Sequence, residues 1–142
     1  MKTLTAIKNI TVETNINAPV EKVWDTMTTP EHIMQWNNAS DDWHTPSAKN
    51  DLRAGGKFVY RMEAKDGSFA FDFGGVFDEI KENELLKYTI GDGRKVTVEF
   101  IPNGAETKVV ETFEAEQTHT VEMQRAGWQA ILDNFKKYVE SI

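Results

Sequence analysis

The sequence has no cysteine, and no hydrophobic run approaches the roughly 20 apolar residues of a membrane helix. The absence of cysteine excludes disulfide bonds, thiol catalysis and thiolate zinc sites, and it is typical of a reducing compartment. Residues 1–16 contain no apolar stretch of signal-peptide length. We therefore expect a soluble, cytoplasmic protein without membrane insertion.

Basic residues are also scarce. The 142 residues include 16 Lys and Arg against 23 Asp and Glu, which gives a formal net charge of −7. Nucleic acids and anionic membranes are bound through clustered Lys and Arg, and here these residues are scattered. We expect no nucleic-acid partner.

Motifs for metal, cofactor and nucleophile chemistry are missing as well. The three histidines, His32, His44 and His119, lie far apart, and His119 has an acidic residue, Glu122, at a helical ligand spacing. No P-loop, dinucleotide-binding glycine motif or serine nucleophile elbow occurs. The sequence predicts no metal site and no cofactor, and it names no catalytic residue. His44 stays a candidate for a pocket mouth, because Trp43 beside it needs a packing partner.

Aromatic residues are plentiful, with eight Phe, four Trp and three Tyr. In residues 68–77, SFAFDFGGVF, three phenylalanines (Phe69, Phe71 and Phe73) alternate with smaller residues and would share one face of a strand. The glycine pair at 74–75 indicates a bulge or sharp bend. Such a stripe is either part of a filled core or the wall of a binding space.

Periodicity and turn signals predict an α+β fold in a single domain, residues 1–142. The order is a strand, two short helices, an antiparallel meander and a long amphipathic C-terminal helix. The expected sheet has about six strands, curves, and wraps the long helix. Residues 37–56 are polar and are expected to form a loop, with a short extended piece near 51–53. The expected strands are 10–16, 57–64, 68–82, 82–93, 94–104 and 106–116, and the expected helices are 20–27, 30–36 and 120–142.

Polar residues on apolar strand faces are candidates for function. Parity places Glu111 on the face of Val109 and Phe113, which leaves two readings: an inward carboxylate with a perturbed pKa, or a face that looks outward near the end of the sheet. Tyr60 and Tyr88 offer hydroxyl groups on inward aromatic rings. We expect the charged residues of the other strand faces to point outward, namely Arg61, Glu63 and Asp72.

Three segments, 16–36, 51–62 and 126–142, carry a family resemblance. Together with the element order, they resemble the helix-grip fold of the START-like (SRPBCC) superfamily, which includes birch-pollen allergens, polyketide cyclases and lipid-transfer domains. Within it, the chain resembles the family named for the C-terminal domain of the activator of Hsp90 ATPase. The matching positions are structural, so no catalytic residue is carried over. The resemblance implies a cavity between the sheet and the long helix that holds apolar or aromatic small molecules.

We therefore expect a carrier or sensor of an apolar or aromatic small molecule. A cyclase, isomerase or hydrolase in the same cavity is an alternative, with Tyr60, Tyr88, Glu111 or His44 as acid or base. A chaperone-interaction module is a weaker alternative, because we expect no counterpart of the separate N-terminal domain of the eukaryotic Hsp90 activator. A homodimer is a further possibility. The expected cavity lining is Trp24, Trp36, Trp43, Phe58, Tyr60, Met62, Phe71, Phe73, Tyr88, Trp128 and Ile131.

Overall fold

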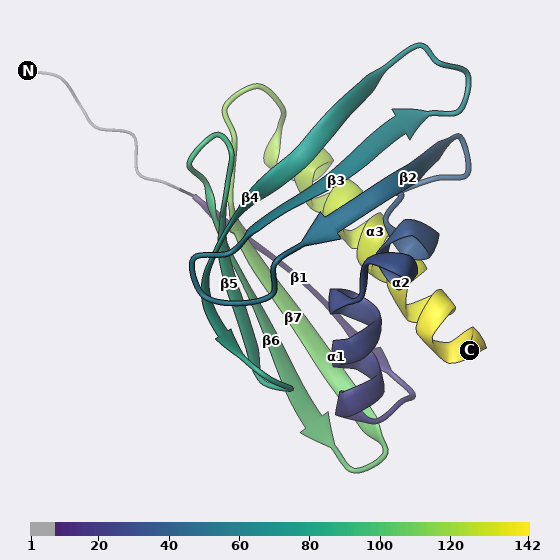
Figure 1. Cartoon of the computed structure of the whole chain (residues 1–142), viewed down its shortest axis with the longest axis vertical. Helices are drawn as coiled ribbons and strands as arrows, with labels where there is room; N and C mark the ends of the chain where they lie inside the picture. The colour runs from purple at the N-terminus through teal and green to yellow at the C-terminus, as the bar shows by residue number, and fades with distance from the viewer. Residues whose placement is uncertain (1–7) are drawn as a thin grey trace, which may run out of the picture.

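A curved antiparallel sheet and one long helix make up most of the structure, a computed structural model that describes residues 8–142 (Figure 1). Residues 1–7, part of the stretch in which no signal peptide was expected, lie outside the described residues. The elements are β1 Asn9–Ile16, α1 Val20–Thr28, α2 Pro30–Trp36, β2 Trp43–Asn50, β3 Lys57–Ala64, β4 Ala70–Lys81, β5 Leu85–Ile90, β6 Lys95–Asn103, β7 Glu106–Glu114 and α3 Val121–Ser141.

The sheet has the strand order β1-β7-β6-β5-β4-β3-β2, with every neighbouring pair antiparallel. Strands β2 to β7 form a meander in chain order. Strand β1 pairs with β7 and forms the edge of the sheet opposite β2. The long helix α3 packs most extensively on β1, while α2 covers β2 (Figure 1). The α+β prediction, with two short helices after the first strand and a long C-terminal helix, is confirmed.

The expected loop at 37–56 is wrong in part, because β2 forms within it and the sheet has seven strands instead of about six. Its sequence, WHTPSAKN, lacks apolar alternation and contains Pro46, which has no N–H for a sheet ladder. The strand tolerates Pro46 because it lies at the sheet edge, and its register with β3 shifts between His44 and Ser47. The side chain of Thr45 is buried and donates to the Asn37 carbonyl oxygen at 2.7 Å.

Strand β4 changes its pairing along its length. Residues 70–76 pair with β3, whereas residues 75–81 pair with β5. The glycines at the changeover allow close approach of both neighbours, since a Cβ on Gly74 would lie 2.8 Å from the Phe58 carbonyl oxygen and one on Gly75 would overlap the Thr89 carbonyl. The bulge itself lies farther on, between Phe77 and Glu79. The hairpin of β3 and β4 therefore extends beyond β5.

The C-terminal helix carries a graded apolar stripe. Thr120 caps it by accepting a hydrogen bond from the Met123 N–H at 3.1 Å. Leu132, Phe135 and Val139 are almost completely buried, whereas the more N-terminal apolar residues of the stripe are only half-buried. This half of the helix therefore faces space that the core does not fill. Within residues 8–142, no helix is long and apolar enough to cross a membrane.

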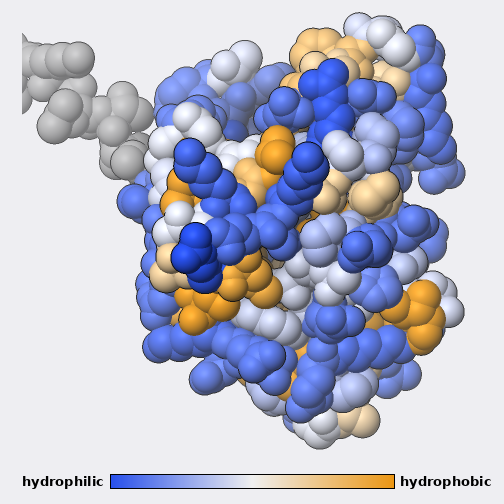
Figure 2. Space-filling model, viewed as in Figure 1, coloured by the Kyte–Doolittle hydropathy of each residue, from blue (hydrophilic) through white to orange (hydrophobic). Residues whose placement is uncertain are grey.

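Figure 2 shows a largely hydrophilic surface with separated hydrophobic areas. One such area lies at the top of this view, over the outer end of the β3–β4 hairpin. Phe69, 60% exposed, and Phe71, 39% exposed, belong to this part of the chain. The hairpin thus presents aromatic surface where it leaves the rest of the sheet.

Candidate functional site

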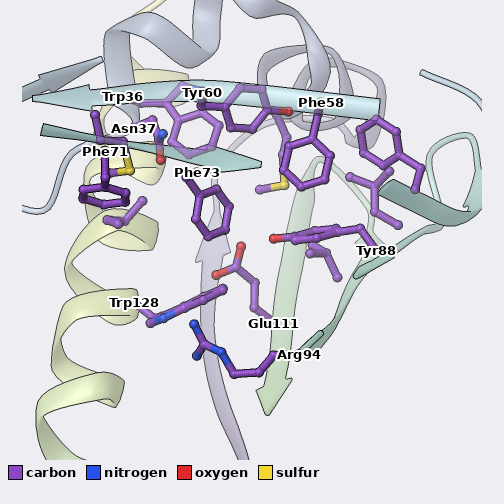
Figure 3. A pocket seen from close by; sticks show the side chains of 16 residues that line it. Trp36, Asn37, Phe58, Tyr60, Phe71, Phe73, Tyr88, Arg94, Glu111 and Trp128 are labelled. Atoms are coloured by element: carbon purple, nitrogen blue, oxygen red, sulfur yellow. The ribbon is translucent and has the colours of Figure 1, made fainter. Parts of the chain in front are cut away.

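A cavity of about 300 Å³ lies between the sheet and α3, where the β3–β4 hairpin diverges from β5 (Figure 3). Strands β3 to β7 supply most of its wall, and α1, the end of α2 and the first half of α3 complete it. Its lining is Met27, Trp36, Asn37, Phe58, Tyr60, Met62, Phe71, Phe73, Phe77, Leu86, Tyr88, Arg94, Val98, Glu111, Trp128 and Ile131.

The structure brings nine of the eleven residues expected at a binding site into this lining: Trp36, Phe58, Tyr60, Met62, Phe71, Phe73, Tyr88, Trp128 and Ile131. Trp24 and Trp43 lie elsewhere. Trp24 is buried under α1 with its ring centroid 5.0 Å from that of Phe100. Trp43 begins β2 and packs edge-on against Phe69 and Phe71, at 6.1 and 6.0 Å. The binding roles of the other nine stay predictions.

The phenylalanine stripe of β4 runs from the surface into the cavity. Phe69 lies just before the strand and is 60% exposed, and its ring centroid is 6.1 Å from that of Phe71. Phe71 is 39% exposed and also lines the cavity, so the cavity reaches the surface beside it. Phe73 lies at the centre of the lining, 6.3 Å from the Trp128 ring (Figure 3). One strand pattern therefore contributes an outer patch, a mouth and an inner wall.

Trp128 forms the floor of the cavity opposite Phe73. Its indole stacks on the buried Phe113 ring with centroids 3.9 Å apart and planes 11° apart. This stacking fixes the side of α3 that the cavity meets. A helical turn farther on, Ile131 continues the same wall.

The Glu111 carboxylate points into the cavity, toward the Tyr88 hydroxyl (Figure 3). It belongs to β7, where its backbone lies between Val12 of β1 and Val98 of β6. Desolvation by burial raises the pKa of Glu111 from 4.5 to about 7. Of the two readings of this strand face, the inward one is confirmed.

Two tyrosine hydroxyls share the cavity with this carboxylate. Burial raises the pKa of Tyr60 to about 12. Burial raises the pKa of Tyr88 well above its usual value, and the nearby charge of Glu111 raises that pKa further. Both tyrosines are therefore neutral hydrogen-bonding groups at ordinary pH.

Sequence reasoning missed two polar residues of the lining. Arg94, in the β5–β6 turn, donates from Nε to Asp92 Oδ2 at 2.8 Å and from a terminal nitrogen to the Glu114 carbonyl oxygen at 3.3 Å. Asn37 follows α2 and is buried, and its Nδ2 is the one buried side-chain polar atom without a hydrogen-bond partner among residues 8–142. Neither residue belongs to a spacing pattern, because one lies in a turn and the other just past a helix end.

The remaining charged candidates lie outside the lining. Arg61 pairs with Glu63 at 3.1 Å and with Asp72 at 3.4 Å, and these partly exposed groups confirm the predicted outward charge pattern. His44 lies 3.5 Å from Glu63 and does not line the cavity. His119 pairs with Glu116 at 3.0 Å. In the described part of the chain, no group of three acidic or histidine side chains could hold a metal ion.

The family described as Activator of Hsp90 ATPase homolog 1-like protein matches residues 17–140. The chain belongs to this family. The solution structure of an AHSA1-like protein from Aeromonas hydrophila is 46% identical, with a TM-score of 0.89 over 94% of this chain and 93% of that one. Chr148 from Cytophaga hutchinsonii is 54% identical, with a TM-score of 0.82 over 94% and 92% of the two chains. The family resemblance of the sequence is thus confirmed.

A more distant member of the same fold is CalU16 from Micromonospora echinospora. It is 20% identical, with a TM-score of 0.69 over 94% of this chain and 76% of that one, so the likeness is one of fold alone. Among curated proteins, none matches the sequence. Fold likeness alone does not determine function, so the cavity is the feature of this family member that bears on its function.

Proposed function

We propose that the protein binds an apolar, aromatic small molecule in the cavity between its sheet and α3. One observation carries this proposal: a space of about 300 Å³ whose lining is mostly aromatic and aliphatic, with a few polar groups that converge on it. Binding sites for small molecules have this composition, because apolar walls supply affinity and sparse polar groups fix orientation.

The size of the space supports an occupant. At about 24 cal/mol per Å³, an empty dry void of this size would cost about 7 kcal/mol, against a total stability of about 5–15 kcal/mol for a typical domain. This energy is an upper bound, because the cavity opens to solvent beside Phe71. Water is a poor occupant of the aromatic end, where it would find too few hydrogen-bond partners. An apolar ligand removes that surface from water.

The proposed ligand has an apolar body and at least one polar group. Its body would lie between Phe58, Phe73 and Trp128, whose rings surround the centre of the lining. Its polar group would reach Glu111 and Tyr88, which face each other there (Figure 3). A purely apolar ligand would leave these two groups without a hydrogen-bond partner, and their desolvation would then weaken binding.

Thermal melting with a panel of uncharged aromatic compounds tests the proposal, together with native mass spectrometry of the purified protein for a ligand that co-purifies. Ile131→Trp would fill the cavity from α3 and should abolish the melting shifts. Met123→Trp is the matched control, because Met123 is 60% exposed on the same helix. No shift with any compound and no co-purified ligand would overturn the proposal. Capture of Hsp90 with a change in its ATPase rate would instead favour the chaperone alternative.

An enzyme in the same cavity is the second candidate, and Glu111 is the observation that favours it. A carboxyl whose pKa is about 7 exchanges protons readily near neutral pH, which suits a general acid or base. The neutral Tyr88 hydroxyl beside it could donate a hydrogen bond to a substrate oxygen. The test is conversion of a bound uncharged compound: Glu111→Gln should retain the binding of that compound and lose its turnover.

A further inference from the structure

Among residues 8–142, Glu111 is the only carboxylate in the cavity lining, and no described basic side chain forms an ion pair with it. Burial alone accounts for its raised pKa. In contrast to Glu111, acidic residues at the surface do form ion pairs: Glu63 and Asp72 both pair with Arg61. A carboxylate that burial has partly removed from water is costly without a cation, unless a bound group provides one.

Arg94, the only basic residue that residues 8–142 contribute to the lining, forms its hydrogen bonds elsewhere. Its Nε donates to Asp92 and a terminal nitrogen donates to the Glu114 carbonyl oxygen, at the β5–β6 turn. Asp92 also accepts from the Arg94 backbone N–H at 3.0 Å, so this turn compensates the guanidinium charge within itself. The cavity side of Glu111 is left for a ligand.

Apart from Arg94, whose charge is compensated in its own turn, the groups that line the cavity around Glu111 are neutral. Tyr88 of β5 points its neutral hydroxyl toward the carboxylate, and the oxygen can accept a hydrogen bond (Figure 3). Tyr60 of β3 is also neutral, but its hydroxyl is directed toward Asn50. The α3 side supplies Trp128 and Ile131, which do not titrate. Aromatic faces attract ammonium groups, most strongly where water is excluded.

From this geometry we propose that the cavity selects a protonated amine carried on an aromatic or other apolar body. The ammonium group donates to the Glu111 carboxylate beside the Tyr88 hydroxyl, and the apolar body lies against Phe73 and Trp128 (Figure 3). This inference rests on the proposed function and names the class of its ligand. The net charge of −7 favours the approach of a cation over that of an anion.

The cavity volume limits the size of the amine. Water occupies about 30 Å³ per molecule in the liquid, so about 300 Å³ corresponds to about ten water-sized groups. A single aromatic ring with a short alkylamine chain has this size. A longer apolar body would extend through the mouth at Phe71, toward Phe69 and Trp43.

Three probes of nearly equal shape test the charge: 2-phenylethylamine, 2-phenylethanol and 3-phenylpropionate. Isothermal titration at about pH 8, where Glu111 is mostly ionised, should give a Kd for the amine at least tenfold below that of the alcohol, with the acid binding most weakly. The affinity for the amine should rise between about pH 6 and pH 8, whereas that for the alcohol should stay constant.

Glu111→Gln removes the charge with little change of shape. It should weaken amine binding at least tenfold and leave alcohol binding unchanged, which also shows that the variant folds. Glu106→Gln, an exposed change on the same strand, should leave both affinities as they are.

The inference is overturned if the alcohol or the acid binds as tightly as the amine, or if Glu111→Gln keeps the preference for the amine. Binding of the alcohol alone would overturn the amine class and leave the proposed function standing. Failure of all three probes would overturn this inference, and the uncharged melting panel would then decide the proposed function.

Discussion

The half-buried carboxylate of Glu111 leads to a prediction about stability that needs no ligand. Folding raises the pKa of Glu111 from 4.5 to about 7, so between these values the folded state binds more protons than the unfolded state. The free energy of unfolding must then fall as the pH rises from about 4.5, and level off above about 7. At 1.36 kcal/mol for each tenfold change, the whole decrease amounts to about 3 kcal/mol, and water in the cavity makes this an upper bound.

Urea denaturation followed by tryptophan fluorescence at about pH 5 and pH 8 measures this decrease. The wild type should lose about 2–3 kcal/mol between the two pH values, while Glu111→Gln should lose almost nothing. Glu106→Gln, on the same strand but exposed, should behave as the wild type does. Groups with lowered pKa values, such as Asp66, Asp92 and Glu116, act in the opposite direction but at more acidic pH. A wild-type stability that stays flat or rises with pH would refute the reasoning, as would an unchanged slope in Glu111→Gln.

Further predictions concern stability and are measured by the same denaturation. Gly75→Ala should cost about 3 kcal/mol, because its Cβ would overlap a backbone carbonyl of β5, whereas Gly127→Ala on α3, with open space around it, should gain about 0.5–1 kcal/mol. Equal effects at the two glycines would contradict this. Phe113→Ala should cost about 3–5 kcal/mol and release Trp128, while Phe69→Ala should stay within about 0.5 kcal/mol. Thr120→Ala should cost about 1 kcal/mol through loss of the α3 cap, and an unchanged unfolding midpoint would contradict that role.

Periodicity sufficed for most of the fold, because apolar alternation and helical spacing reflect which faces are buried. It failed for β2, since an edge strand that contains Pro46 satisfies the sheet on one side only and does not need alternating apolar residues. The glycine pair at 74–75 indicates a bulge or a sharp bend. The ladder shift of β4 lies between Phe77 and Glu79, because it depends on how β4 exchanges β3 for β5.

The candidate site was predictable in its aromatic part. Strand parity placed Glu111 with Val109 and Phe113, but whether that face pointed inward depended on the packing of α3. Trp24 lies on an apolar helix face like other core residues, and its sequence spacing does not distinguish core from cavity wall. Arg94 and Asn37 reach the cavity from a turn and a helix end, where the sequence carries no periodic signal.

The methionine methyl groups give the most direct test of the central claim that the cavity holds a small apolar molecule. Met27 and Met62 line the cavity, whereas Met34 and Met123 are 37% and 60% exposed outside it. We expect saturable methyl NMR shifts at Met27 and Met62, with nuclear Overhauser effects to the ligand, when the tightest uncharged aromatic of the melting panel is added. Met34 and Met123 should not move. Shifts confined to the exposed pair, or no saturable shift at any of the four, would contradict the account.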